Sequence, residues 1–390
     1  MDINSKTFCP LLYNGIATDP SGGYRPCCRF HQSESFRGSL DDYKSSDMYK
    51  KIEQEFLTGV WPKGCLDCKE NEERNGESKR LREISNYKNK YNQDIDLGHL
   101  QSIKYDLVDL RLSNKCNLGC LSCNPKSSSV IFDEVKEHPN LEQHLSHYRV
   151  MFDGVKDKDL TNPYSDEEID KLFDCVGKTS RIYFTGGEPS IVKGALKFLQ
   201  RLIDEGYNET VNLEFNSNFQ TYNPKFIDLL SHFPNGLMLP SIDAIGERAE
   251  YIRYPSDWSQ IEKNIKLFTE KCPTWRMRFA PTISLLNIFY LDELADYCDK
   301  NNYDYSLMNI LFGPQYFNIT IMPDKWKDIA LDKLKHLPEV EGIRKYIYSR
   351  DPDLERLQAC RTNLNRADRI RNNNFRRSLP ILKEMFNECL

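Results

Sequence analysis

From about residue 103 onward, short runs of alternating apolar and polar residues are separated by longer amphipathic segments. Alternation with a period of two predicts strands, and apolar residues three or four apart predict helices. Six strands are expected, at residues 103–112, 181–185, 211–215, 237–242, 276–283 and 305–310. Segments such as 195–204 and 258–268 have the length and pattern of the helices between them. Strands joined by helical crossovers predict an α/β fold with a parallel sheet, which we expect to curl into a partial (β/α)6 barrel of the TIM type.

The chain before this region is rich in turn-forming residues. Pro10, Pro26 and the segment 19–23 leave little room for regular structure before Cys27. Ser46 is placed to cap a short helix, because apolar residues follow it at helical spacing. These features predict a small, loop-rich N-terminal module.

Charge and capping signals complete the division of the chain. The charged residues 69–82 predict one solvated helix that leads into the barrel, and Ser165 with Glu168 forms a capping box for a helix inside it. The pattern after the last strand is helical, so we expect a helical extension there. The expected parts are a module at 1–98, the barrel at 99–330 and the extension at 331–390.

Composition restricts where the protein works. With 28% charged and 39% hydrophobic residues, and no apolar run near the ~20 residues that span a bilayer, we expect a soluble protein without a membrane partner. The start of the chain lacks the apolar segment of a signal peptide, so a cytoplasmic location is expected. A net charge of −5 gives no basic surface for nonspecific nucleic-acid binding. In a reducing compartment, 13 cysteines indicate metal binding or catalysis rather than disulfides.

Three cysteines follow the first barrel strand with the spacing Cys116-x3-Cys120-x2-Cys123. In (β/α) barrels the chemistry lies in the loops at the carboxyl ends of the strands, which is where this triplet falls. Iron–sulfur clusters are held by cysteine thiolates, normally four per cluster. Three thiolates would leave one iron of a four-iron cluster open to another ligand. The alternative is a zinc site with one further ligand, although zinc sites favour paired C-x2-C units.

A glycine turn follows the second barrel strand. Its sequence is Thr185-Gly186-Gly187-Glu188-Pro189. Two glycines allow the backbone to approach a ligand closely, and the carboxylate and carbonyl groups can accept hydrogen bonds from an ammonium group. The alternative is an ordinary strand-to-helix turn.

Together the triplet and the GGEP turn resemble the signature motifs of the radical S-adenosylmethionine (SAM) superfamily. The resemblance implies that the amino and carboxylate groups of SAM chelate the open iron, and that the GGEP turn binds the amino group. It further implies that the reduced cluster cleaves SAM to a 5′-deoxyadenosyl radical, which abstracts a hydrogen atom from the substrate. Ser122 departs from the pattern, because relatives commonly have an aromatic or bulky residue before the last cysteine.

The same resemblance extends to two later strand ends. The segment Asn216-Ser217-Asn218 stands where relatives have a segment near the SAM ribose and carboxylate, and Asn216 and Ser217 are the site residues expected there. Ser241 and Arg253 match a serine and an arginine that hold the SAM carboxylate in relatives with additional clusters. In this region the pattern departs at Ala244, where relatives have glycine. The alternative is that each of these residues is an ordinary polar group at a strand end or on a helix surface, without a role in binding SAM.

A second group of cysteines lies near the N-terminus: Cys9, Cys27 or Cys28, Cys65 and Cys68. Four thiolates are enough for a zinc tetrahedron or for a complete four-iron cluster, and the spacing does not choose between them. The surrounding sequence resembles the twitch and SPASM modules of radical SAM enzymes, although these usually follow the barrel. The resemblance implies one auxiliary [4Fe–4S] cluster, for which we favour Cys27 over Cys28.

The leading hypothesis is therefore a radical SAM enzyme with two clusters. Its expected partners are SAM, an electron donor such as flavodoxin or ferredoxin, and a peptide or protein whose side chain is oxidatively modified. An RNA or nucleotide substrate is the alternative within this class, since several arginines lie at 361–377. A zinc-stabilised binding protein and a simple electron carrier are the alternatives outside it.

Overall fold

The computed structural model describes residues 5–31, 34–138, 160 and 162–390, and the chain divides into two compact units. We call them unit 1 and unit 2 and describe each separately. Unit 1 consists of Met1–Lys115, Arg149–Phe215 and Lys225–Gly236. Unit 2 consists of Cys116–Tyr148, Asn216–Pro224 and Leu237–Leu390.

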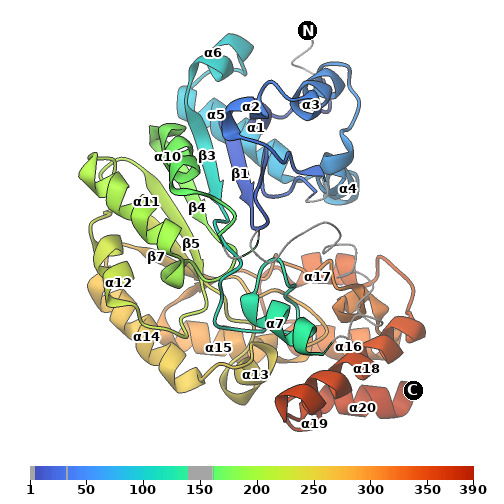
Figure 1. Cartoon of the computed structure of the whole chain (residues 1–390). Coiled ribbons are helices and arrows are strands. Elements are labelled where there is room, and N and C mark those ends of the chain that lie inside the picture. Colours follow the sequence, from blue (N-terminus) through green and yellow to red (C-terminus); the bar gives the residue numbers. More distant parts are fainter. Residues whose placement is uncertain (1–4, 32–33, 139–159, 161) are drawn as a thin grey trace. The chain divides into compact units, whose positions relative to one another are not determined.

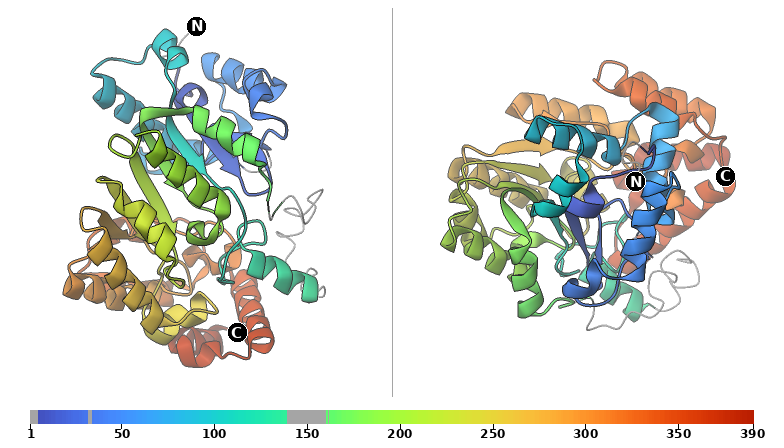
Figure 2. Two further views of the ribbon diagram at one scale, coloured as in Figure 1. Left: turned by 60° about the vertical axis from the view of Figure 1, so that its left-hand side comes forward. Right: turned by 90° about the horizontal axis from the view of Figure 1, so that it is seen from above.

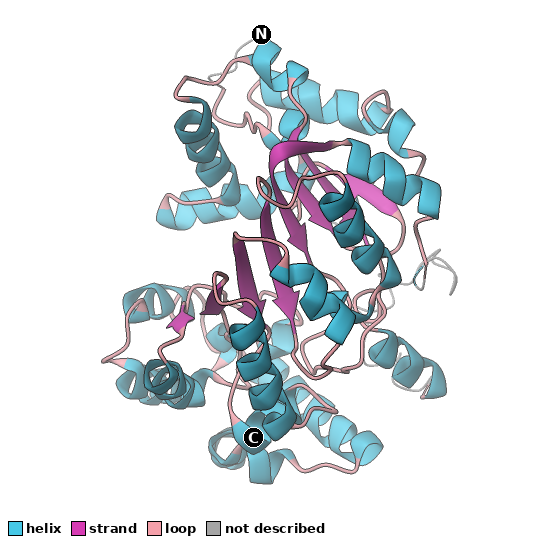
Figure 3. Ribbon diagram, turned by 90° about the vertical axis from the view of Figure 1, so that its left-hand side faces the viewer, coloured by secondary structure: helices cyan, strands magenta, loops and turns pink. Residues whose placement is uncertain are grey.

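The strands of unit 1 pair in the order β2-β1-β3-β4-β5 (Figures 1 and 3). Only the β1–β2 pair is antiparallel, and the other pairs are parallel. Their bounds are Gly15–Asp19 (β1), Gly23–Arg25 (β2), Tyr105–Leu110 (β3), Val176–Phe184 (β4) and Asn212–Ser217 (β5). β3, β4 and β5 confirm the first three expected strands.

Two strands, β1 and β2, extend this sheet from the N-terminal segment. They form a hairpin whose turn is held by the Tyr164 hydroxyl, which accepts hydrogen bonds from the N–H groups of Asp19 at 2.9 Å and Gly23 at 3.0 Å. The expectation of little regular structure before Cys27 is therefore wrong. Turn residues interrupt these strands without preventing them, because pairing with β3 satisfies their backbone groups.

Helices α11 (Lys193–Asp204) and α12 (Pro224–Ser231) cover one face of the unit 1 sheet (Figure 2). Phe184 of β4 packs on Phe198 of α11 with ring centroids 5.8 Å apart, and Phe215 of β5 packs on Phe226 of α12 at 5.3 Å. Successive side chains of a strand point to opposite faces. Tyr183 and Glu214, the neighbours of these phenylalanines, therefore point to the other face of the sheet.

Unit 1 contains further short helices. Their bounds are α1 (Leu11–Asn14), α2 (Leu40–Tyr43), α3 (Asp47–Leu57), η2 (Lys63–Cys65), α4 (Leu66–Asn75), α5 (Lys79–Tyr91), α6 (Leu97–Ser102), α10 (Asp166–Asp174) and η4 (Pro189–Ile191). Ser46 caps α3, and the capping box of α10 is present, as expected. The single solvated helix expected at 69–82 is wrong. The chain breaks at Gly76, whose φ of +75° ends α4, and Arg80 of α5 is buried.

Unit 2 contains the remaining strands and most of the C-terminal helices. Its strands β6 (Gly236–Pro240), β7 (Arg276–Phe279) and β8 (Asp304–Tyr305) are parallel. β6 and β7 confirm the strands expected at 237–242 and 276–283, whereas β8 shares only Tyr305 with the strand expected at 305–310. The helices are α7 (Ser129–Glu137), α13 (Gly246–Ile252), α14 (Trp258–Lys271), η5 (Ile288–Tyr290), α15 (Leu291–Asn301), η6 (Gln315–Phe317), η7 (Ile319–Ile321), α16 (Asp324–Leu334), α17 (Val340–Ile347), α18 (Leu354–Arg371), α19 (Phe375–Ser378) and α20 (Pro380–Cys389). Buried residues of α18 and α20 join the same apolar core as η5.

The protein is thus an α/β protein whose parallel strands alternate with helices, as expected for a partial TIM-type barrel. None of the helices in the described part of the chain is both long and apolar enough to cross a membrane.

Candidate functional site

The loop that carries the cysteine triplet is fixed by hydrogen bonds within unit 2. The N–H of Gly119 donates to the carbonyl of Tyr254 at 2.5 Å, and the N–H of Leu121 donates to Ile252 at 2.9 Å. Ser128, the N-cap of α7, donates its hydroxyl proton to the carbonyl of Leu118 at 2.7 Å. The chain after α13 and the start of α7 therefore hold the loop from two sides.

The thiols of the triplet lie in a poorly solvated environment. Cys120 is buried, while Cys116 and Cys123 are partly exposed. Burial raises the pKa of Cys120, and burial together with Cys120 raises the pKa of Cys123 to about 12. A thiol must lose its proton to bind a metal, and burial makes a thiolate without a metal unfavourable. A bound iron would compensate the negative charge and so stabilise the thiolates. Soft sulfur donors of this kind fit an iron–sulfur cluster.

Arg253 lies beside the triplet and is ion-paired. Its Nη2 is 2.8 Å from Oδ2 of Asp243, and its Nη1 donates to Sγ of Cys120 at 3.7 Å. Burial opposes the charge, but Asp243 and Cys120 outweigh it and raise the pKa of Arg253. Asp243 is itself held by the N–H of Thr282, which donates to Oδ1 at 2.8 Å. Among the described residues Arg253 Nε has no hydrogen-bond partner, so one donor remains for a ligand.

The ends of β5 and β6 bring further predicted residues together in unit 2. The N–H of Ser241 donates to the carbonyl of Ser217 at 2.7 Å, and the Oδ1 atom of Asn216 is buried without a hydrogen-bond partner in the described part of the chain. Asn218 is a residue that the sequence analysis missed as a site residue. Its Nδ2 lies 4.0 Å from Sγ of Cys116 and donates to Oδ1 of Asn117 at 2.8 Å. Only its place next to Ser217 could have indicated this role.

The GGEP turn belongs to unit 1 and is closely packed. Gly186 and Gly187 have φ values of +79° and +61°, which favour glycine. A Cβ atom on Gly187 would lie 2.3 Å from the carbonyl oxygen of Lys115, and the N–H of Glu188 donates to that oxygen at 2.8 Å. The glycines therefore let the turn approach the chain just before Cys116. The buried Glu188 is the N-cap of η4, and Pro189 is its first residue. The carboxylate of Glu188 accepts a hydrogen bond from the N–H of Ser190.

The N-terminal cysteines form a second group, within unit 1. Burial raises the pKa of Cys27 to about 12, and Cys28 and Cys68 contribute to this shift. After burial, Cys27 and Cys68 raise the pKa of Cys9, and Cys27, Cys9 and Cys68 raise that of Cys65. Cys9, Cys27 and Cys65 therefore each lie within electrostatic range of at least two other cysteines.

Cys28 has different surroundings from its neighbour in sequence. After burial, the groups that affect its pKa most are Asp109, Lys79 and Arg111. Cys28 is nevertheless the charged group that raises the pKa of Cys27 most. Cysteines of this group thus affect the pKa values of Cys9, Cys27 and Cys65, whereas the charged group with the largest effect on the pKa of Cys28 is Asp109 of β3.

Arg80 holds the segments that carry these N-terminal cysteines. Its Nε and Nη2 donate to both carboxylate oxygens of Glu72 at 2.8 and 2.6 Å, and its Nη1 donates to the carbonyl of Phe8 at 2.9 Å. Ser78 also donates to Glu72, at 2.6 Å. This network joins α4, α5 and the residue before Cys9.

No group of three or more His, Cys, Asp or Glu side chains within the described ranges is arranged to hold a single metal ion. The thiolates of a four-iron cluster bind different iron atoms, so they are further apart than the ligands of one ion.

Comparison with protein families identifies the domain that contains the triplet. Residues 110–298 match the family model described as the Radical SAM superfamily. This part of the chain is a radical SAM superfamily domain, and the family implies a four-iron cluster and SAM. The match contains the cysteine triplet, the GGEP turn and Arg253.

Similar solved structures include native anSMEcpe with bound AdoMet, with 16% identity and a TM-score of 0.42 over 59% of this chain and 59% of that one. Streptococcus suis SuiB bound to S-adenosylmethionine has 13% identity and a TM-score of 0.35 over 74% of this chain and 58% of that one. The chain thus spans less than two thirds of the length of these structures. A search of curated proteins gives no match.

Proposed function

We propose that Cys116, Cys120 and Cys123 hold the catalytic [4Fe–4S] cluster and that SAM completes it. The observation that carries this proposal is the triplet, which lies on a fixed loop inside the radical SAM domain. When bound, the cluster and SAM supply a 5′-deoxyadenosyl radical that abstracts a substrate hydrogen atom.

The residues of the chain bind and orient SAM in this proposal. Backbone carbonyls at Gly186 and Gly187 and the carboxylate of Glu188 accept hydrogen bonds from the ammonium group. Asn216, Ser217 and Ser241 meet the ribose and carboxylate. Arg253 contributes through Nε, while Asp243 and Cys120 fix its other nitrogens. We expect an electron donor such as flavodoxin or ferredoxin to reduce the cluster.

The second part of the proposal concerns the N-terminal cysteines. Cys9, Cys27, Cys65 and Cys68 hold an auxiliary [4Fe–4S] cluster, which is supported by the effect of Cys27 and Cys68 on the pKa values of both Cys9 and Cys65 in unit 1. A second cluster gives the substrate radical an electron acceptor, which favours oxidative chemistry. The resemblance of these segments to twitch modules favours the side chain of a peptide or protein as the substrate.

The alternative of an RNA or nucleotide substrate rests on the arginines at 361–377. Arg371 is buried and its guanidinium is ion-paired with Glu134 at 3.0 Å, so it is not presented to phosphates. Arg377 is ion-paired with Glu247. Arg369 is exposed. Salt-dependent RNA binding that is lost in Arg369→Gln would favour this alternative, and RNA affinity that does not change would remove it.

Reductive cleavage of SAM tests the main proposal. The anaerobically reconstituted protein, reduced with flavodoxin or dithionite, should convert SAM to 5′-deoxyadenosine, and the Cys116→Ala/Cys120→Ala/Cys123→Ala variant should not. Equal product from both proteins would contradict the proposal. Zinc in place of iron after anaerobic purification would instead support a zinc-stabilised binding protein, and redox activity without SAM binding would support an electron carrier.

A further inference from the structure

A row of polar residues crosses the unit 1 sheet at one level. The strand register places Arg25 of β2 opposite Ala17 of β1, Ala17 opposite Asp109 of β3, Asp109 opposite Tyr183 of β4, and Tyr183 opposite Glu214 of β5. Residues paired in register point to the same face of a sheet. This face is the one turned away from α11 and α12, because the phenylalanines next to Tyr183 and Glu214 pack on those helices.

Arg25 is the most unusual member of the row. It is 1% exposed, and its Nη1 donates to the carbonyl of Phe30 at 2.8 Å. Its Nε and Nη2 have no hydrogen-bond partner among the described residues. These two nitrogens form the edge of a guanidinium that binds a carboxylate with two parallel hydrogen bonds. Arg80 and Arg371 each use the same edge to bind a carboxylate, that of Glu72 and of Glu134 respectively. In Arg25 the corresponding donors have no such carboxylate among the described residues.

Asp109 and Arg111 also have polar atoms without hydrogen-bond partners among the described residues. Asp109 is fully buried, and within the described part of the chain neither of its carboxylate oxygens has a hydrogen-bond partner. Arg111 Nε is 3.5 Å from Oδ1 of Asp109, close enough for charge attraction but without a hydrogen bond. Buried polar groups are normally hydrogen-bonded, and a buried group without a partner costs about 1–3 kcal/mol. Several such groups in one place indicate a ligand site.

The strand spacing separates the charged groups of this row from one another. Neighbouring strands are about 4.8 Å apart, so Arg25 and Asp109 are separated by roughly twice that distance across β1. The residue between them in the row is Ala17, whose side chain is short. A ligand over Ala17 would have a two-donor edge on one side and an acceptor on the other.

We propose that Arg25, Asp109 and Arg111 form a subsite that binds a carboxylate of the substrate. Arg25 Nε and Nη2 donate to the two carboxylate oxygens, Arg111 Nε adds a third donor, and Asp109 accepts from an N–H or O–H group of the same substrate. The carboxylate belongs to an acidic side chain or to the C-terminus of a peptide. This assignment rests on the proposed function and names the substrate chemistry of that function.

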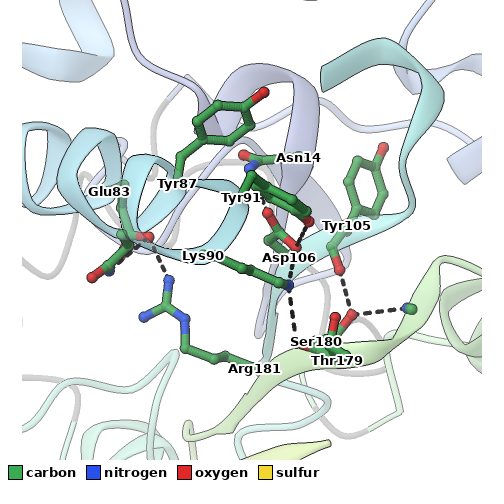
Figure 4. Close-up of polar contacts among 12 residues, drawn as sticks. Asn14, Glu83, Tyr87, Lys90, Tyr91, Tyr105, Asp106, Thr179, Ser180 and Arg181 are labelled. Atoms are coloured by element: carbon green, nitrogen blue, oxygen red, sulfur yellow. Dashed lines mark hydrogen bonds and ion pairs between the residues drawn. The ribbon is translucent and has the colours of Figure 1, made fainter. Parts of the chain in front are cut away.

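The opposite, amino-terminal ends of these strands do not offer the same chemistry. A cavity of about 560 Å³ lies there, lined by residues that include Asn14, Glu83, Lys90, Asp106 and Arg181. Its charged side chains are already paired, Lys90 with Asp106 and Arg181 with Glu83 (Figure 4). Arg181 lies on the same strand as Tyr183 and is thus a matched control for Arg25.

Binding of small peptide mimics tests the subsite. The reconstituted protein with SAM is titrated with two pairs of probes, and the affinity for each probe is followed by ligand-detected NMR. The first pair is acetyl-glutamate methylamide and acetyl-glutamine methylamide. The second pair is acetyl-alanine and acetyl-alanine methylamide. We expect one acid probe to bind at least about tenfold more tightly than its amide partner. The first pair reports an acidic side chain and the second a terminal carboxylate.

Variants then connect the preference to Arg25. Arg25→Lys keeps the charge but loses the two-donor edge and should abolish most of the preference, whereas Arg181→Lys should retain it. Equal binding of acid and amide, no binding of either, or a preference that survives in Arg25→Lys would overturn the proposal. If circular dichroism shows that Arg25→Lys does not fold, Asp109→Asn and Arg111→Lys take its place. A wild-type protein that cleaves SAM but shows no preference refutes the subsite alone, and one that does not cleave SAM refutes the proposed function.

Discussion

At the scale of single residues, Gly187 has the most demanding backbone position in the GGEP turn. Alanine there would combine a φ of +61° with a Cβ atom 2.3 Å from a backbone oxygen. We expect Gly187→Ala to lower the free energy of unfolding by roughly 3 kcal/mol or more and to reduce SAM cleavage, because the turn must move away from Lys115. Urea denaturation and 5′-deoxyadenosine formation measure both effects.

Gly206 is the matched control for this prediction. Its φ is +70°, but nothing lies within 4 Å of a Cβ atom built on it. Gly206→Ala should therefore cost only the strain of the left-handed conformation, about 1 kcal/mol. If both variants lose the same stability, close packing of the GGEP turn is not the cause.

Cys298 gives a prediction of pH dependence away from both cysteine groups. Burial, followed by Asp299, raises its pKa to about 12, whereas an unfolded thiol titrates near ~8.5. Because the pKa of this thiol is higher in the folded than in the unfolded protein, its protonated form contributes fully to stability below the pKa of the unfolded state. This contribution is lost as the pH rises from the unfolded-state pKa toward the folded-state pKa. Relative to Cys298→Ala, the wild type should lose about 1.4 kcal/mol of unfolding free energy between pH 7.5 and 9.5. A difference that stays constant in urea titrations at both pH values would contradict this assignment.

Sequence reasoning worked best where one residue type carries the chemistry. The cysteine triplet and the GGEP turn could be recognised because sulfur ligands and positive φ values demand particular residues. Arg25 could not be recognised in this way. Its role depends on the register of β2 against β1 and β3, and on which nitrogen atoms remain without partners. Neither is encoded in local spacing.

At the scale of elements, α18 braces the loop that carries the triplet. Arg371 near its end donates from Nε and Nη2 to Glu134 of α7, and its guanidinium lies 5.2 Å from the ring of Tyr254. A Cβ atom on Gly119 of the cysteine loop would lie 3.3 Å from Arg371 Nη2. The C-terminal helices therefore support the site rather than only extending the chain.

Glu134→Gln tests this brace. The variant leaves the buried Arg371 with a neutral partner, and we expect the free energy of unfolding to fall by about 2 kcal/mol. The control is Arg369→Gln, an exposed residue of the same helix, which should change stability by less than about 0.5 kcal/mol. Urea midpoints that are equal in the two variants would show that the Arg371–Glu134 pair does not stabilise unit 2.

The elements themselves were predictable where local signals agreed with packing. The first five barrel strands, the Ser46 cap and the capping box of α10 follow from patterns that the folded chain preserves. β1 and β2 were missed, because their stability comes from β3, about 90 residues later, and from Tyr164. The break at Gly76 was missed for a similar reason, since the network of Glu72 with Ser78 and Arg80 favours two helices over one.

At the scale of the whole molecule, each compact unit contains one group of cysteines. The triplet lies in unit 2 and the N-terminal group lies in unit 1. Because the two groups are supported by separate networks, loss of one metal site should leave the other intact. Iron content therefore reports each site independently.

The choice between Cys27 and Cys28 provides the sharpest form of this test. Two four-iron clusters predict about eight iron atoms per chain after anaerobic reconstitution, and about four in the triple variant of Cys116, Cys120 and Cys123. In the background of that triple variant, Cys27→Ser should lose most of the remaining iron, because Cys27 is among the groups that raise the pKa of both Cys9 and Cys65. Cys28→Ser should retain about four iron atoms, since the charged groups with the largest effect on its pKa are Asp109 and Lys79. The reverse pattern would make Cys28 the ligand and would move the auxiliary site toward β3.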